Sequence, residues 1–247
     1  MFKTTIKSEH IKDITTALKA MVSEAKWNLT PEGITIKAVD PANVAMVSLD
    51  IKKEAFEAYE ATDGELGIDL TKLGGLLDMA EKDSIVELEL DEVAHKLRVR
   101  MGTLQYTMAL LDPSTIRKEP KVPNLDLPGT IIIKGEDIRR AVKASLTVGD
   151  YMTIGIEGES CVMTADGDTD AVKLELLKTE LIEITNTGKD IKSLYSIDYL
   201  DKIGKIAAKV AQVTIHIGQD FPCKIGFDMF GGNGTVSYMI APRVESS

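Results

Sequence analysis

The chain contains an internal repeat, and this feature restricts its fold more than any other. Shifting the sequence by 127 positions places residue 7 on residue 134, and Ile6, Lys7, Glu9, Ile11 and Lys12 then fall on Ile133, Lys134, Glu136, Ile138 and Arg139. At the same shift an alternating apolar pattern repeats, because Trp27, Leu29, Ile36 and Ala38 fall on Ile154, Ile156, Met163 and Ala165. A helical pattern followed by strand patterns, present twice, predicts two duplicated domains.

Residues 110–128 separate the two copies and carry four of the chain's eight prolines. Proline fixes φ and removes a backbone donor, so this stretch favours an extended, semi-rigid linker. We expect a solvated path for the polar residues Arg117, Lys118, Glu119 and Lys121, with apolar anchors at Ile116, Val122 and Leu125. The predicted organisation is an N-terminal domain at 1–109, a linker at 110–128 and a C-terminal domain at 129–247.

Each copy has the pattern of a strand, a helix and then several strands. Apolar stripes at helical spacing, such as Ile11, Ile14 and Leu18 or Ile138, Val142 and Leu146, predict helices that bury one face against a sheet. Further helices are predicted at 70–80 and 198–210. Alternation predicts strands at 33–39, 84–90, 96–101, 104–110, 151–156 and 213–217. The expected fold class is α+β, with four helices on one face of mostly antiparallel sheets.

The charges are unevenly distributed. Lys and Arg total 29 against 39 Asp and Glu, a formal net charge of −10, which excludes a nucleic-acid-binding protein that is basic all round. Basic residues nevertheless gather along three predicted helices: Lys12 and Lys19, then Arg139, Arg140 and Lys143, then Lys202, Lys205 and Lys209. Each group alone is typical of a solvated helix face. Three such groups in an acidic protein favour a wall that contacts DNA phosphates weakly, without reading base sequence.

Signs of an enzyme are few. The three histidines are far apart in sequence, no metal-binding spacing or nucleotide-binding motif occurs, and we expect no catalytic residues, no metal and no cofactor. The two cysteines indicate free thiols in a reducing compartment, and no secretory signal or membrane span is evident, so we expect a cytoplasmic protein without membrane contact. A duplicated α+β enzyme that uses carboxylates such as Asp40 is the less favoured alternative.

Three segments resemble the proliferating cell nuclear antigen family in its archaeal branch: Val39-Asp40-Pro41-Ala42-Asn43-Val44, Leu110-Leu111-Asp112-Pro113, and Tyr238-Met239-Ile240-Ala241-Pro242-Arg243-Val244-Glu245. The resemblance covers essentially the whole chain. It implies a sliding clamp and polymerase processivity factor: three two-domain subunits close head to tail into a homotrimeric ring around duplex DNA, with no chemistry of their own. A subunit of a heterotrimeric or checkpoint-type ring remains an alternative.

The resemblance also implies functional residues. Lys12, Lys19, Arg140, Lys143 and Lys205 stand at positions that are basic on the family's inner wall, whereas Arg139, Lys202 and Lys209 are added from helical spacing alone. On the second helix the family often has lysines where this chain has Gly75 and Asp78. Subunit contact is expected between the strand of Tyr106, Thr107 and Met108 and that of Val172 and Leu174 in the next subunit.

Partner proteins are expected at a pocket beneath the linker. Matching positions here are Val39, Asn43, Val44, Ile116, Pro222, Met239, Ala241 and Pro242, and Met239 stands where relatives often have an aromatic residue. Family partners carry a Gln-x-x-aliphatic-x-x-aromatic-aromatic peptide whose apolar side chains enter such a pocket. The resemblance thus implies DNA polymerase, ligase and nuclease as partners, and a separate clamp loader that opens the ring.

Overall fold

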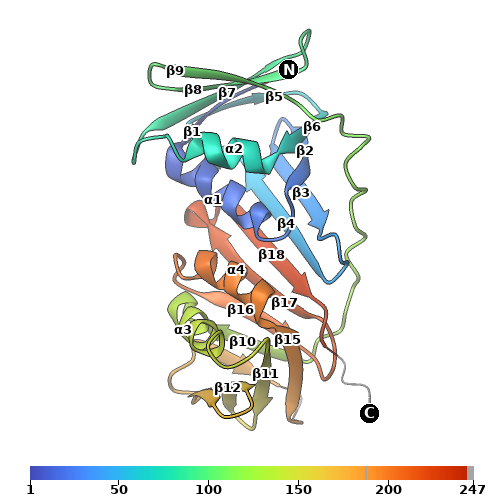
Figure 1. Cartoon of the computed structure of the whole chain (residues 1–247), viewed down its shortest axis with the longest axis vertical. Coiled ribbons are helices and arrows are strands. Elements are labelled where there is room, and N and C mark those ends of the chain that lie inside the picture. The colour runs from blue at the N-terminus through green and yellow to red at the C-terminus, as the bar shows by residue number, and fades with distance from the viewer. Residues whose placement is uncertain (187, 244–247) are drawn as a thin grey trace. The chain divides into compact units, whose positions relative to one another are not determined.

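The computed structural model describes residues 1–186 and 188–243, and its chain divides into two compact units (Figure 1). Unit 1 comprises Met1–Pro120 and Asp228–Val236, and unit 2 comprises Lys121–Phe227 and Ser237–Ser247. Val244 and Glu245, the end of the third family-like segment, lie outside the described residues. No helix in the described ranges is long and apolar enough to cross a membrane.

The internal repeat is confirmed element by element. The first copy begins with β1 (Phe2–Lys7), α1 (Ser8–Lys19), β2 (Glu24–Thr30) and β3 (Gly33–Val39), and the second with β10 (Gly129–Ile133), α3 (Gly135–Ser145), β11 (Tyr151–Glu157) and β12 (Ser160–Asp166). Strand register repeats as well, because Trp27 lies opposite Ile36 in β2–β3 and Ile154 lies opposite Met163 in β11–β12. The same alternation of apolar residues therefore builds the same hairpin twice.

Unit 1 contains two sets of antiparallel strands. One sheet has the order β5 (Ala58–Ala61), β1, β7 (Ile85–Asp91), β8 (Lys96–Met101) and β9 (Leu104–Ala109). The other set pairs in the order β6 (Gly64–Asp69), β2, β3 and β4 (Ala45–Lys52), and a short 3-10 helix, η1 (Lys53–Ala55), follows β4. Helix α1 packs on β1 and β7, whereas α2 (Leu70–Leu77) packs on β2 and β6.

Unit 2 repeats this plan. Its four-stranded sheet has the order β13 (Ala171–Leu176), β12, β11 and β15 (Ile191–Ser196). A second set pairs in the order β14 (Glu183–Thr185), β10, β16 (Val213–Ile217) and β17 (Cys223–Met229). Helix α3 packs on β13, β11 and β12, and α4 (Ile197–Ala207) packs on β15. A 3-10 turn, η2 (Phe230–Gly232), precedes β18 (Gly234–Ile240), and the residues of both β17 and β18 are divided between the units.

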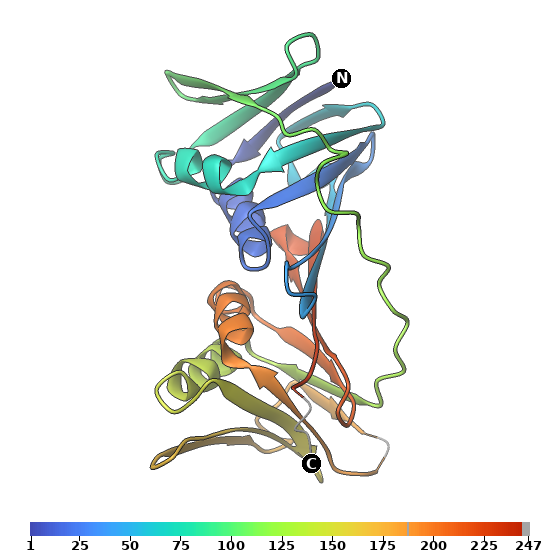
Figure 2. The ribbon, with the colours of Figure 1, turned by 45° about the vertical axis from the view of Figure 1, so that its right-hand side comes forward.

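The helices lie in pairs within each unit, α1 beside α2 and α3 beside α4 (Figure 2). Their apolar stripes are buried as expected at Ile11, Ile14 and Leu18, and at Ile138 and Val142. The predicted burial of Leu146 in the stripe of α3 was wrong. Leu146 is 43% exposed, because α3 ends at Ser145 and Leu146 is its C-cap residue. The four helices of the described residues and the antiparallel sheets confirm the expected α+β class.

We predict a pH dependence of unit 2 through His216, whose Nδ1 lies 3.0 Å from Oγ1 of Thr130. Burial, and secondarily the nearby Lys224, lower the pKa of His216 below its ordinary value. The unfolded chain therefore takes up a proton first, and the folded state loses stability as the pH falls through and below about 6.5. Urea midpoints should fall more for the wild type than for His216→Gln between about pH 7.5 and about pH 5.5; equal falls would contradict this assignment.

Candidate functional site

In unit 1, the two predicted basic residues of α1 differ in solvent exposure and in hydrogen bonding. Lys12 is half-buried, and its ammonium donates a hydrogen bond to the carbonyl oxygen of Ala80 at 2.8 Å, beyond the end of α2. Lys19 is exposed and lies against α2, where a Cβ added at Gly74 would come within 2.8 Å of its Nζ. Lys12 thus supports the end of the neighbouring helix, and Lys19 is the more available of the two cations.

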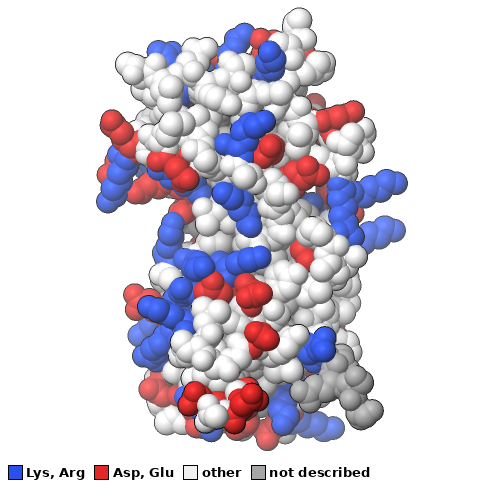
Figure 3. Space-filling view, in the orientation of Figure 1, with Lys and Arg blue, Asp and Glu red and all other residues white. Residues whose placement is uncertain are grey.

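In unit 2, α3 and α4 carry five of the other six predicted cations, and Lys209 lies in the turn after α4, because that helix ends at Ala207. Lys143, Lys202, Lys205 and Lys209 are exposed, as is Arg140, while Arg139 is half-buried. Acidic side chains lie among the Lys and Arg over these helices (Figure 3). Arg140 pairs with Asp137 at 3.2 Å, and the Nζ of Lys202 lies 5.6 Å from the ring centre of Tyr199. The face is basic but is not uniformly so.

Asp201 connects the two helices of unit 2. One carboxylate oxygen is 2.5 Å from Arg139 of α3, and the other is 2.6 Å from Lys205, one turn further along α4. Burial opposes ionisation of Asp201, but hydrogen bonds from Lys205 and Arg139 outweigh it and hold the pKa of the carboxyl below its usual range. The spacing of Asp201 and Lys205 signals an ion pair in the sequence, whereas the contact with Arg139 required the fold.

The loop after β3 is built around one buried carboxylate, that of Asp40. It accepts hydrogen bonds from the backbone N–H groups of Ala42, Val44 and Ala45 at 2.7 to 3.0 Å. Asn43, at the turn, has a left-handed φ of 60°, a conformation that asparagine tolerates better than most residues. The Asp40 carboxylate thus holds the loop that carries Asn43 and Val44, a structural role that accounts for its burial without catalysis.

The linker begins with a close backbone approach. The N–H of Leu111 donates to the carbonyl of Gly67 at 2.9 Å, and a Cβ at Gly67 would lie only 2.3 Å from the carbonyl oxygen of Leu111. Only glycine fits at this crossing. Asp112 then forms a turn by accepting the N–H of Ser114 at 2.9 Å, and hydrogen bonds from Ser114 hold the pKa of Asp112 below its usual range.

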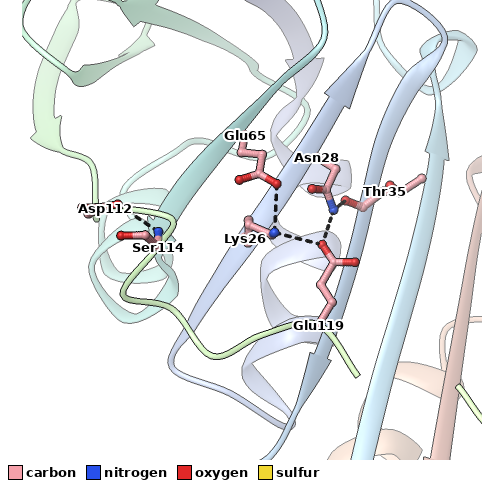
Figure 4. Close-up of polar contacts among 7 residues, drawn as sticks. All are labelled: Lys26, Asn28, Thr35, Glu65, Asp112, Ser114 and Glu119. Atoms are coloured by element: carbon pink, nitrogen blue, oxygen red, sulfur yellow. Dashed lines mark hydrogen bonds and ion pairs between the residues drawn. The ribbon is translucent and has the colours of Figure 1, made fainter. Parts of the chain in front are cut away.

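The middle of the linker is held to unit 1 by polar side chains. Arg117 donates to the carbonyl oxygen of Asp40 at 2.8 Å and also to Oδ1 of Asn43. Glu119 accepts from Nδ2 of Asn28 at 2.6 Å and lies 3.6 Å from the ammonium of Lys26 (Figure 4). Arg117 is exposed, as the expected solvated path requires, although its guanidinium is paired with the loop, whereas Glu119 is half-buried against β2.

Lys26 is shared by two carboxylates. Its Nζ lies 2.9 Å from Glu65 on β6 as well as near Glu119, and the hydrogen bond with Glu65 contributes most to a raised pKa of Lys26 (Figure 4). Asn28 also donates to the backbone oxygen of Thr35 at 3.2 Å. Glu119 thereby ties the linker to β2 through Lys26 and Asn28, and Asn28 is itself held to β3.

These tethers border a surface cavity of about 180 Å³ in unit 1. Val39 and Ile116, both predicted partner-pocket residues, line it together with Val22, Ala38 and Pro41. Ile116 is only 8% exposed, which confirms it as an apolar anchor, whereas Val122 is exposed and is not one. The structure therefore brings Val39 and Ile116 together at one cavity. Asn43 does not line this cavity, but its side chain accepts a hydrogen bond from Arg117, which does.

The other predicted pocket residues, Pro222, Met239, Ala241 and Pro242, belong to unit 2 and are all partly exposed. The loop before Pro222 is fixed to β15: Ser193 donates to the carbonyl of Gly218 at 2.8 Å, and Tyr195 donates to that of Phe221 at 2.8 Å. The N–H of Arg243 donates to the carbonyl of Leu194 at 2.7 Å. One strand thus holds both segments that carry these residues, a role that the sequence did not indicate.

Strands β9 and β13 each form an edge of their sheet. On β9, Tyr106 is 40% exposed and Thr107 is exposed, but Met108 is buried in the core of unit 1. On β13, Val172 and Leu174 are half-buried. Of the predicted interface residues, Met108 can thus contribute only its backbone at the strand edge.

Metal binding and thiol chemistry find little support among the described residues. Among the described residues, no group of His, Cys, Asp and Glu is placed to hold a metal ion. Cys161 and Cys223 are free and buried, and burial raises the pKa of each thiol to about 12, so both are protonated at neutral pH. Buried thiols of this kind are inert, so Cys161 and Cys223 serve as core residues.

Comparison with known proteins gives a consistent result. Residues 1–106 match the sequence model "Proliferating cell nuclear antigen, N-terminal domain". Proteins named DNA polymerase sliding clamp are 48% identical in Methanococcoides burtonii, over 100% of both chains, and 42% identical in Natronomonas pharaonis, again over 100% of both. A solved structure described as the C-terminal region of FEN-1 bound to A. fulgidus PCNA matches with a TM-score of 0.93 at 35% identity, covering 100% of both chains.

We predict that Glu119→Gln loosens the linker. The substitution keeps the shape of the side chain but removes the ion pair with Lys26 and the charge that strengthens the hydrogen bond from Asn28. A protease of broad specificity should cleave the linker near Glu119 several-fold faster, because a loss of about 1 kcal/mol of interaction energy in the tether opens this segment more often. Lys118→Gln, at an exposed neighbouring position, is the matched control, and equal cleavage rates in both variants would count against the tether.

Proposed function

The chain belongs to the proliferating cell nuclear antigen family, and on that basis we propose that three copies close head to tail into a ring around duplex DNA. It is a DNA polymerase sliding clamp, a processivity factor that performs no chemistry of its own. In this proposal the clamp domains are 1–109 and 129–247, joined by the linker 110–128, and the protein works in the cytoplasm.

Ring closure rests on one observation, the two sheet edges formed by β9 and β13. An edge strand presents unpaired backbone donors and acceptors that can pair with a second chain. Pairing β9 of one copy with β13 of the next is heterologous, so it continues around a closed ring when the rotation between copies fits. A homotrimer is the proposed closure, and a heteromeric ring would instead leave the isolated chain monomeric.

The DNA-facing surface is proposed on the helices, where Lys19, Arg140, Lys143 and Lys205 project from a protein of net charge −10. Lys12, Arg139, Lys202 and Lys209 belong to the same proposed surface. Enclosure by the ring makes strong phosphate contacts unnecessary, and weak contacts let the ring slide. Binding should therefore depend on salt and be indifferent to base sequence.

The partner site is proposed at Val39, Asn43, Val44, Ile116, Pro222, Met239, Ala241 and Pro242. Support comes from the cavity beside Ile116, from the partly exposed apolar residues near the chain's end, and from the related structure that holds a C-terminal region of FEN-1. Nuclease and polymerase are the proposed partners, together with ligase and a clamp loader. Each would dock a short apolar peptide of the pattern Gln-x-x-aliphatic-x-x-aromatic-aromatic.

Tyr106→Glu should break the ring. A carboxylate at the β9 edge would be desolvated by the neighbouring strand, so static light scattering should find a mass near that of one 26.9 kDa chain instead of three. Val93→Glu adds the same charge at a turn position that is 95% exposed, and it should leave the trimer intact. A trimeric Tyr106→Glu variant would refute the proposed contact.

Pro242→Asp should weaken partner binding. Placing a charge among apolar pocket residues opposes burial of the peptide's aromatic side chains, so the dissociation constant should rise at least about tenfold, or about 1.4 kcal/mol. Calorimetric titration with a synthetic peptide of the above pattern measures this, with Val93→Asp as the charge control. Unchanged affinity in Pro242→Asp would argue that peptides bind elsewhere.

A further inference from the structure

Asp201 occupies an unusual place on the basic face of unit 2. It is the carboxylate between two cations, Arg139 at 2.5 Å and Lys205 at 2.6 Å, and these belong to two different helices. Its side chain is only 14% exposed, whereas that of Lys205 is 58% exposed. The anion is therefore more buried than either cation, since the Arg139 side chain is 24% exposed, and most of the accessible surface of the cluster belongs to Lys205.

The arrangement is electrostatically persistent. The two cations hold the pKa of Asp201 below its usual range despite its burial, so the carboxylate is ionised at neutral pH. The cluster of Asp201, Arg139 and Lys205 thus carries one net positive charge in place of two. It also restrains both cations, because each hydrogen bond to the carboxylate must be strained or broken before that cation reaches outward.

We propose that Asp201 limits how tightly this face binds DNA, by neutralising one of two adjacent cations and restraining both. The inference rests on the proposed contact between α3, α4 and the phosphates. A clamp that slides needs a local positive potential without long-lived phosphate contacts, and an anion fixed between the cations provides this. Asp201 is accordingly a positioning residue that acts through Arg139 and Lys205.

A role in stability alone does not account for the arrangement. The Arg139–Asp201 pair, with side chains 24% and 14% exposed, joins α3 to α4 and contributes to the stability of unit 2. The pair with Lys205, whose side chain is 58% exposed, contributes little to the free energy of folding. Removal of the Asp201 charge from this cluster would, in contrast, raise the positive potential that DNA phosphates meet and so change DNA affinity directly. The two roles therefore predict different measurements.

The test compares Asp201→Asn with Asp198→Asn, which makes the same change of charge in the first turn of the same helix, where Asp198 is exposed. Fluorescence anisotropy with a short linear DNA duplex measures affinity between about 50 and about 200 mM salt. For Asp201→Asn we expect affinity to rise about three- to tenfold at the lower salt and the log–log salt slope to steepen by about 0.9, one additional phosphate contact. Asp198→Asn should change affinity less than about twofold, since screening weakens a charge that lies outside the cluster.

A double variant separates charge from damage to the fold. Arg139→Gln combined with Asp201→Asn removes one cation and the anion, so the cluster again carries one positive charge, and the salt slope should return to the wild-type value. Light scattering and thermal unfolding of each variant verify the ring and the fold. If Asp201→Asn folds but binds DNA no more tightly than Asp198→Asn, or if the double variant keeps the steeper slope, the inference is wrong.

Failure of the proposed DNA contact itself would give a different pattern of DNA affinities. If Arg139→Gln and Lys205→Gln singly leave DNA affinity and its salt slope unchanged, the α3–α4 face does not meet DNA, whatever Asp201 does. If those variants weaken binding while Asp201→Asn has no effect, the face binds DNA and only the role of Asp201 is refuted.

Discussion

Burial of short amphipathic helices against antiparallel strands is the interaction on which the rest of this molecule depends. Helices of 8 to 12 residues are marginal on their own, so α1 to α4 persist because their apolar stripes are covered by sheet. Once Ile11, Ile14 and Leu18 face inward, the polar side of α1 must face away from the core. The same packing in the second copy directs Arg140, Lys143 and Lys205 outward. Placement of the cations follows from placement of the core.

The linker follows a different physical rule. Its prolines prevent a helix or a central strand, so its course depends on side chains that bind it to unit 1. Arg117 and Glu119, on either side of Lys118, form these contacts with unit 1, while Ile116 lines the same cavity as Val39. Because charged tethers fix an apolar anchor, the shape of the cavity beneath the linker depends on polar contacts at its border. A partner peptide would meet a surface that is already arranged.

The charges of the molecule balance two needs. A net charge of −10 disfavours adhesion to DNA by the whole surface, and in the proposed ring the basic helices would supply attraction only at the inner wall. Asp137 and Asp201, which pair with cations of those helices, would reduce that attraction further. Enclosure by a ring is compatible with such weak contacts, whereas an open DNA-binding protein would need stronger ones.

The repeat and its apolar periodicity determined the duplicated fold, because alternation and helical spacing are local properties of the chain; strands β3, β8 and β16 begin and end where that periodicity predicts. Short or irregular strands such as β5 and β14 carry too few residues to show a pattern. The partner-pocket positions came from the family resemblance, and Ile116 and Pro222 lie outside the three segments that carry it. Only the tertiary structure could pair Arg117 with Asp40, Glu119 with Asn28 and Arg139 with Asp201, which are 77, 91 and 62 residues apart. A charged residue shows the same letter in the sequence whether it is solvated or paired, and the partner is decided by which strands and helices the core brings together.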